Sequence, residues 1–149
     1  MKAIVACGLA IVTLSCGGGT PDPAVLDTRN EACAHCRMAV SSARFASQIV
    51  APGEEPRFFD DLGCLAAYLR EAPAQPAGAL AYVADHRTAE WVPAADAIFT
   101  KVPALETPMG SHVVAHASPA SRDADEAARG GTPVEAAGYF GRTLPGDPR

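Results

Sequence analysis

The chain has no cluster of basic residues, and its N-terminal apolar run is too short to cross a membrane. Its 149 residues include 12 lysines and arginines against 17 aspartates and glutamates, which gives a formal net charge of −5. An acidic chain without a basic patch argues against nucleic acid as a partner. The apolar run covers residues 3–14, whereas a membrane-spanning helix needs ~20 residues.

This short run instead indicates an export signal. A lysine precedes it, and it ends at Leu14-Ser15-Cys16, which three glycines follow. The ending resembles a bacterial lipobox, in which the cysteine is acylated and becomes the new N-terminus. Cys7 follows a similar motif but leaves almost no apolar region ahead of it, so we expect acylation at Cys16. An ordinary secretory leader with cleavage nearby is the alternative, and it predicts the same extracytoplasmic compartment.

Loss of the leader leaves three thiols, in Cys33, Cys36 and Cys64, and a chain long enough for one domain. Because three is odd, at least one thiol stays unpaired, which suggests a ligand or a reactive group. A tolerated buried cysteine, Cys64 in particular, is the alternative. We expect four segments: a signal peptide (1–15), a lipidated and flexible tether (16–30), a metal-binding domain (31–131) and a Gly- and Pro-rich tail (132–149) that is poorly ordered at its end.

The order of the expected elements predicts an α+β fold with small antiparallel strands and two helices, rather than a βαβ alternation. It leaves open two related ββα-type lobes. Strands are expected at 44–50, 57–59, 80–83, 90–92, 98–102 and 112–115, with helices from Asp60 or Asp61 to about residue 72 and from 118 to 129.

The segment Cys33-Ala34-His35-Cys36-Arg37-Met38 places four potential soft-metal ligands in six residues. Thiolate and thioether sulfur select Cu(I). A c-type haem would need histidine where Arg37 stands, and a closed four-cysteine zinc site needs more thiols than the three that remain after loss of the leader and acylation of Cys16. A zinc site of three cysteines and a histidine stays open. A thioredoxin-type pair would follow a strand, and residues 24–32 show no strand pattern.

Three further residues are candidate ligands or modifiers of such a site. Cys64 falls in the first turn of the expected helix, where the helix dipole should lower its thiol pKa, although the neighbouring Asp60 and Asp61 act the other way. Met109 lies in a turn between proline and glycine, which is harder to explain as core packing, and His112 could add a nitrogen ligand.

Two other histidines are expected to lie outside any metal site. His116 would stand ~13 Å from His112 along a strand, too far for both to bind one ion. We expect His116 at the surface or a sheet edge and His86 in a solvated turn.

Three motifs in this order resemble the NosL family of lipoproteins, which are accessory proteins of nitrous oxide reductase assembly. They are Cys-x-x-Cys-Arg-Met, the segment 59–65 (Phe-Asp-Asp-Leu-Gly-Cys-Leu) and the segment 107–111 (Thr-Pro-Met-Gly-Ser), with Trp91 between the last two. Arg37 stands where many members of the family have glycine. His112 and His116 replace residues expected to be small and aromatic.

The resemblance implies a compact fold similar to the alkylmercury lyase domain and a periplasmic, lipid-anchored Cu(I) chaperone rather than an enzyme. It implies delivery of copper to nitrous oxide reductase or another cuproenzyme, with help from a membrane maturation complex. Gly17 after the acylated cysteine resembles an outer-membrane sorting signal. On the family's motifs fall Cys36, Met38, Asp60, Cys64 and Met109, to which we add Cys33 and His112 as metal-site candidates.

An enzymatic function is the alternative. A thiol–disulfide oxidoreductase would use the Cys33/Cys36 pair together with Cys64. An organomercurial lyase would use two thiolates and an aspartate that protonates the leaving carbon, and Cys36, Cys64 and Asp60 or Asp61 could fill these roles.

Overall fold

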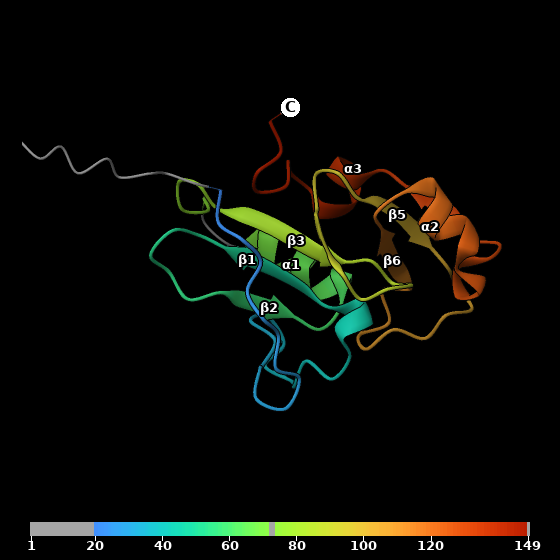
Figure 1. The fold of residues 1–149 in the computed structure, drawn as a ribbon, viewed down its shortest axis with the longest axis horizontal. Helices are drawn as coiled ribbons and strands as arrows, with labels where there is room; N and C mark the ends of the chain where they lie inside the picture. Colours follow the sequence, from blue (N-terminus) through green and yellow to red (C-terminus); the bar gives the residue numbers. More distant parts are fainter. Residues whose placement is uncertain (1–19, 72–73, 149) are drawn as a thin grey trace, which may run out of the picture.

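The computed structural model describes residues 20–71 and 74–148, which form two antiparallel sheets with helices packed around them (Figure 1). This arrangement confirms the predicted α+β class. The four-stranded sheet has the order β2-β1-β3-β4, and the three-stranded sheet has the order β6-β5-β7. The strands are β1 (Ser47–Val50), β2 (Arg57–Phe59), β3 (Leu80–Ala84), β4 (Trp91–Pro93), β5 (Ile98–Lys101), β6 (Val113–His116) and β7 (Thr132–Val134).

Helix α1 (Leu62–Glu71) covers one face of the four-stranded sheet. Leu62, Leu65 and Leu69 recur at helical spacing and are buried in the same core cluster as Ile49 of β1 and Val83 of β3. The helix therefore buries its apolar stripe against the sheet and presents its N-terminus to the loops that carry the cysteine motif. No helix in the described parts of the chain is long and apolar enough to cross a membrane.

The predicted helix over 118–129 is wrong in its length, because the chain forms two short helices instead. Ser118 caps α2 (Pro119–Ala124) as expected, since its hydroxyl accepts a hydrogen bond from the Ser121 amide. Asp125 then takes an extended conformation, and its carboxylate caps the 3-10 helix η2 (Glu126–Ala128). A second 3-10 helix, η1 (Ala43–Phe45), replaces the first residues of the strand expected from residue 44.

A strap of residues 20–24 crosses the face of the four-stranded sheet that α1 leaves free, and the strap is the blue segment in front of the sheet in Figure 1. Gln48 and Tyr82 are register partners on β1 and β3. The Gln48 side chain exchanges two hydrogen bonds with the backbone of Ala24, and the Tyr82 hydroxyl donates to the Pro21 carbonyl at 2.9 Å. The strap thus fixes part of the segment that the sequence predicted to be a flexible tether.

The C-terminal segment is more structured than its glycine and proline content predicted. Strand β7 pairs with β5, and helix α3 (Ala136–Phe140) packs on α1. Phe140 and Leu144 are buried in the main core, where Phe140 meets Phe99 of β5 edge to face. Two well-placed apolar residues are enough to anchor a segment whose composition alone suggests disorder.

Asp85 joins the two sheets at the turn after β3. One carboxylate oxygen accepts from the backbone amides of Arg87 and Thr88 in its own turn, and the other accepts from the Ala117 amide and the Ser121 hydroxyl on the far side. A parallel bridge between Asp85 and Ala115 continues the connection. The two sheets therefore share one core, and the buried carboxylate of Asp85 helps to join them.

Candidate metal centre

The Cys33–Met38 motif forms a tight loop at the edge of the four-stranded sheet. The loop is closed by a bridge between Ala32 and Ala39, by a bond from the Cys33 amide to the Met38 carbonyl at 2.8 Å, and by one from the Arg37 amide to the Cys33 carbonyl at 3.0 Å. The Ala34 amide also donates to the Phe58 carbonyl of β2. These bonds fix the loop where β2 ends, next to Asp60 and the start of α1.

Four ligand atoms meet there: the sulfurs of Cys33, Cys36 and Cys64 and a carboxylate oxygen of Asp60 all lie within 4.8 Å of one another. Cys33, Asp60 and Cys64 are buried, whereas Cys36 is half-exposed and lies 3.6 Å from Asp60 Oδ1. All three cysteines are free thiols. The cluster can hold one ion with three sulfur donors and one oxygen, and it is open to solvent on the Cys36 side.

The prediction of a lowered thiol pKa at Cys64 is wrong. Burial, and after it the hydrogen bond with Asp60, raises the pKa of the Cys64 thiol far above its ordinary value. Burial likewise raises the pKa of Cys33. Because α1 begins inside the core, desolvation outweighs the helix dipole, and in the metal-free protein these two thiols keep their protons at neutral pH.

Asp61 brings the third sequence motif, 107–111, to the start of α1. Its Oδ2 accepts from the Thr107 hydroxyl at 2.6 Å and from the Met109 amide at 3.0 Å, while Oδ1 accepts from the Gly63 amide. Burial opposes ionisation of Asp61, but the hydrogen bonds from Ser111, Thr107, Met109 and Gly63 together hold its pKa below the usual value. Sequence reasoning treated Asp61 as a helix cap and did not identify it as the clamp for the Met109 turn.

Of the remaining predicted site residues, Met38 and Met109 are tied to the cluster through backbone hydrogen bonds, and His112 is outside the group of ligand atoms. Met38 and Met109 are 49% and 45% exposed. The Met38 carbonyl accepts from the Cys33 amide, and the Met109 amide donates to Asp61, the neighbour of Asp60. His112 follows the Met109 turn with its Nδ1 atom 2.8 Å from the Leu105 carbonyl oxygen. Their roles as ligands, like those of the cysteines and Asp60, remain predictions. Cys16 lies outside the described residues.

A second group of ligand atoms, separate from the thiol cluster, was missed from the sequence. His86, His116 and Asp125 each offer a ligand atom within 4.8 Å of the others. The placement of His116 at the surface and of His86 in a solvated turn is wrong, because their exposures are 0% and 2%. The parallel bridge between the sheets brings the end of β3 against β6, and no local sequence pattern signals that contact.

Residues 24–138 match the NosL family model, which covers most of the chain and all three motifs of the thiol cluster and its flanking turn. The chain belongs to the NosL family. No curated protein and no solved structure matches it significantly.

NosL membership and the thiol cluster together fit a copper-related role. Three sulfur atoms in one cluster are the donor set expected for a soft ion. The fold brings Cys33, Cys36 and Cys64 together in a single candidate site, although Cys33 and Cys64 are 31 residues apart in the sequence.

Proposed function

We propose that this NosL-family protein binds one Cu(I) ion outside the cytoplasm and passes it to a cuproenzyme, with nitrous oxide reductase and its membrane maturation complex as the expected recipient. The gathering of three free thiols and Asp60 within 4.8 Å supports the proposal most strongly. A lipid anchor at Cys16, placing the protein in the periplasm and at the outer membrane, belongs to the same proposal.

The donor set favours Cu(I) over Zn²⁺. Zinc is satisfied by nitrogen and oxygen and gains little from thioether, whereas Cu(I) accepts both thiolate and thioether sulfur. The two exposed methionines, Met38 and Met109, are therefore the discriminating feature. Methionine usually fills gaps in a core, so two solvent-exposed thioethers beside a thiol cluster call for a chemical explanation.

The gradient of burial across the site supports delivery of the ion. Cys33 and Cys64 are buried, Cys36 is half-exposed, and the thioethers of Met38 and Met109 face solvent. An ion held by the buried thiols can be approached at its exposed edge by soft donors of a partner, which allows transfer by exchange of one ligand at a time. Reprotonation of Cys33 and Cys64, whose thiol pKa values burial raises, would favour release.

Anaerobic titration of the reduced chain with Cu(I) against a competing chelator tests the proposal. We expect one Cu(I) per chain, loss of most binding in Cys33→Ser/Cys36→Ser, and at least tenfold weaker binding in Met109→Ile, which corresponds to about 1.4 kcal/mol. Val25→Ala removes another exposed apolar side chain that offers no ligand, and this control should bind normally. Unchanged copper affinity in the double cysteine variant would contradict the assignment of the site.

The contact between Cys36 and Asp60, 3.6 Å apart with Cys64 in the same cluster, favours an organomercurial lyase as the second candidate. Two thiolates would take up mercury while the Asp60 carboxyl group delivers a proton to the released carbon. Catalytic turnover of an organomercurial would identify this function, whereas a chaperone shows only stoichiometric metal binding.

A further inference from the structure

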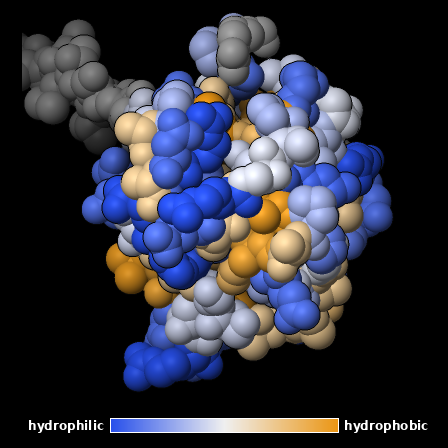
Figure 2. Space-filling view, turned by 90° about the vertical axis from the view of Figure 1, so that its right-hand side faces the viewer, coloured by the Kyte–Doolittle hydropathy of each residue, from blue (hydrophilic) through white to orange (hydrophobic). Residues whose placement is uncertain are grey.

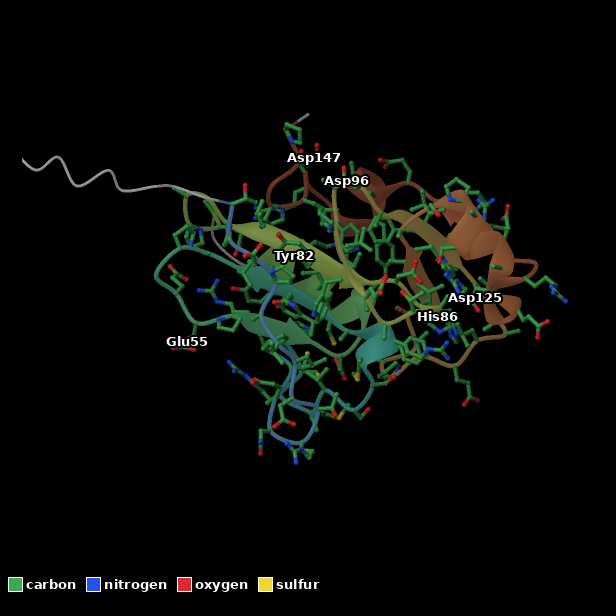
Figure 3. All side chains as sticks on the ribbon, viewed as in Figure 1. Glu55, Tyr82, His86, Asp96, Asp125 and Asp147 are labelled. Atoms are coloured by element: carbon green, nitrogen blue, oxygen red, sulfur yellow. The ribbon has the colours of Figure 1, made fainter. Side chains whose placement is uncertain are left out.

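The buried histidines His86 and His116 approach one carboxylate oxygen from two sides. His86 Nδ1 lies 2.6 Å from Asp125 Oδ2, and His116 Nε2 lies 3.0 Å from the same atom. The three residues come from the turn after β3, the end of β6 and the junction of α2 with η2. Figure 3 shows His86 and Asp125 adjacent at the α2 end of the molecule. Figure 2 views this end of the molecule, where hydrophilic residues surround an apolar area near the centre of the face.

Hydrogen bonding alone accounts poorly for this arrangement. A neutral imidazole has a single N–H, and His116 uses its Nε2 toward Asp125 while its Nδ1 is buried with no hydrogen-bond partner among the described residues. Burial of His116 costs free energy, because the ring loses its water and gains only one hydrogen bond in return. A coordinate bond from Nε2 to a cation would compensate for the loss of water far better than one hydrogen bond does.

The charge around the cluster also favours a cation. Asp125 contributes a carboxylate oxygen to the cluster itself. The buried carboxylate of Asp85 belongs to the same turn as His86, and it accepts hydrogen bonds from the Ala117 amide and the Ser121 hydroxyl on the side of β6 and α2. The guanidinium group of Arg87, an exposed residue, donates to the Ser121 hydroxyl, and that of Arg44 donates to the Arg87 carbonyl, so neither pairs with Asp125.

We propose that His86, His116 and Asp125 form a second metal site, which binds a divalent cation of the zinc class independently of the thiol cluster. Two imidazole nitrogens and one carboxylate oxygen are a common zinc donor set, and they lack the sulfur that Cu(I) prefers. The two sites would therefore divide metals by ligand chemistry, with the soft ion at the thiol cluster and the borderline ion at the histidines.

The surroundings of the site hold the ligands in place. Asp125 Oδ1 accepts from the Ala127 amide at 3.0 Å, which orients the carboxylate so that Oδ2 faces the imidazoles. The Phe45 ring lies 5.0 Å from the His86 ring between centroids and excludes water on that side. Ligand atoms on a tetrahedral zinc ion lie roughly 3.3 Å apart, so small outward rotations of the side chains would admit the ion.

Cobalt(II), a spectroscopic probe for zinc sites, tests the proposal in the full chain. After one equivalent of Cu(I) has filled the thiol cluster, we expect one equivalent of Co²⁺ to bind and to give visible ligand-field bands without thiolate-to-cobalt charge transfer. His116→Phe, which keeps a ring at this position, should abolish these bands, and Asp125→Asn should weaken binding at least tenfold. His35→Asn, at a histidine outside the cluster, is the matched control and should bind Co²⁺ normally.

A second readout covers variants that fold poorly. Zn²⁺ should raise the melting temperature of the copper-loaded protein but not that of His86→Asn. Any one of three results would overturn the proposal. They are no Co²⁺ binding, ligand-field bands that are unchanged in the folded His116→Phe variant, and a cobalt spectrum with thiolate-to-cobalt charge transfer. Because charge transfer reports on the thiol cluster separately, failure of the copper proposal would be distinguishable from failure of this site.

Discussion

Arg37 and His112, which stand at positions where glycine or a small residue is expected in the family, both have left-handed backbones. Their φ angles are +70° and +57°. A side chain in this region brings its Cβ close to the backbone carbonyl, which costs roughly 1–2 kcal/mol, and glycine avoids that cost. The preference for glycine at position 37 thus comes from the turn that closes the thiol loop rather than from metal chemistry.

Arg37→Gly should therefore stabilise the protein. We expect the free energy of unfolding to rise by about 0.5–1 kcal/mol, since relief of the left-handed strain exceeds the added entropy of glycine in the unfolded chain. Urea denaturation of the metal-free protein measures the change. Arg129→Gly is the matched control, because Arg129 is exposed and has an ordinary φ of −63°, and this variant should lose stability. Equal losses in both variants would contradict the strain at Arg37.

Between elements, α1 approaches the Met109 turn closely beside the candidate metal centre. A Cβ added to Gly63 would lie 3.0 Å from Asp61 Oδ1 and 3.0 Å from the Ser111 Cβ atom. Glycine in a helix normally lowers stability, yet here it permits the turn to pack against the first turn of α1. The position of Met109 thus depends on residue 63 of α1 having no side chain.

Gly63→Ala should reverse the usual effect of alanine in a helix. Instead of a gain, we expect a loss of about 1 kcal/mol in the free energy of unfolding and weaker Cu(I) binding, because the 107–111 turn must move away from α1. Thermal melting and the chelator competition measure the two effects. In the control Gly138→Ala, the new Cβ meets only the flexible carboxylate end of Glu135, so stability should be unchanged or higher. A stabilised Gly63→Ala would show that the turn is not packed there.

A helix or strand could be predicted where the residues that determine it lie close together in the sequence. The strand at 57–59 and the start of α1 were predicted because apolar spacing and a capping aspartate act within a few residues. The break at Asp125 was missed because Asp125 bonds to His86 and His116, both distant in sequence.

The candidate site was predictable to the same degree. The Cys33/Cys36 pair was evident from spacing, whereas Cys64 was a candidate from its place at the start of a helix and from the resemblance to the family, and its approach to the pair needed the structure. The raised thiol pKa of Cys64 depends on burial by the assembled core, which the sequence does not display locally.

For the molecule as a whole, Asp85 is the main polar connection between the two sheets. Its folded-state pKa of about 2 lies below the ordinary value of 3.8, so ionised Asp85 stabilises the fold. That stabilisation is present above about pH 4 and is lost as the pH falls through 2. The difference corresponds to about 2 kcal/mol.

Asp85→Asn should lower the free energy of unfolding by about 2 kcal/mol at pH 7 and by much less near pH 2, where the wild-type carboxylate is protonated. Urea denaturation of both proteins across this pH range measures the gap. Asp123→Asn is the control, because Asp123 is exposed and pairs only with its neighbour Arg122. If the difference in free energy of unfolding between the wild type and Asp85→Asn stays constant with pH, packing and not the carboxylate charge stabilises the connection between the sheets.

The strap over the four-stranded sheet would limit how far the domain can move from a lipid anchor at Cys16. Because Tyr82 and Gln48 hold residues 21 and 24, residues 17–19 lie between the proposed anchor and the strap. The four steps from residue 16 to residue 20 span at most ~14 Å, so the domain would stay close to the membrane surface. A short tether of this kind raises the effective concentration toward recipients in the same membrane into the millimolar range. Recipients farther away than the tether and domain can reach would receive no copper directly.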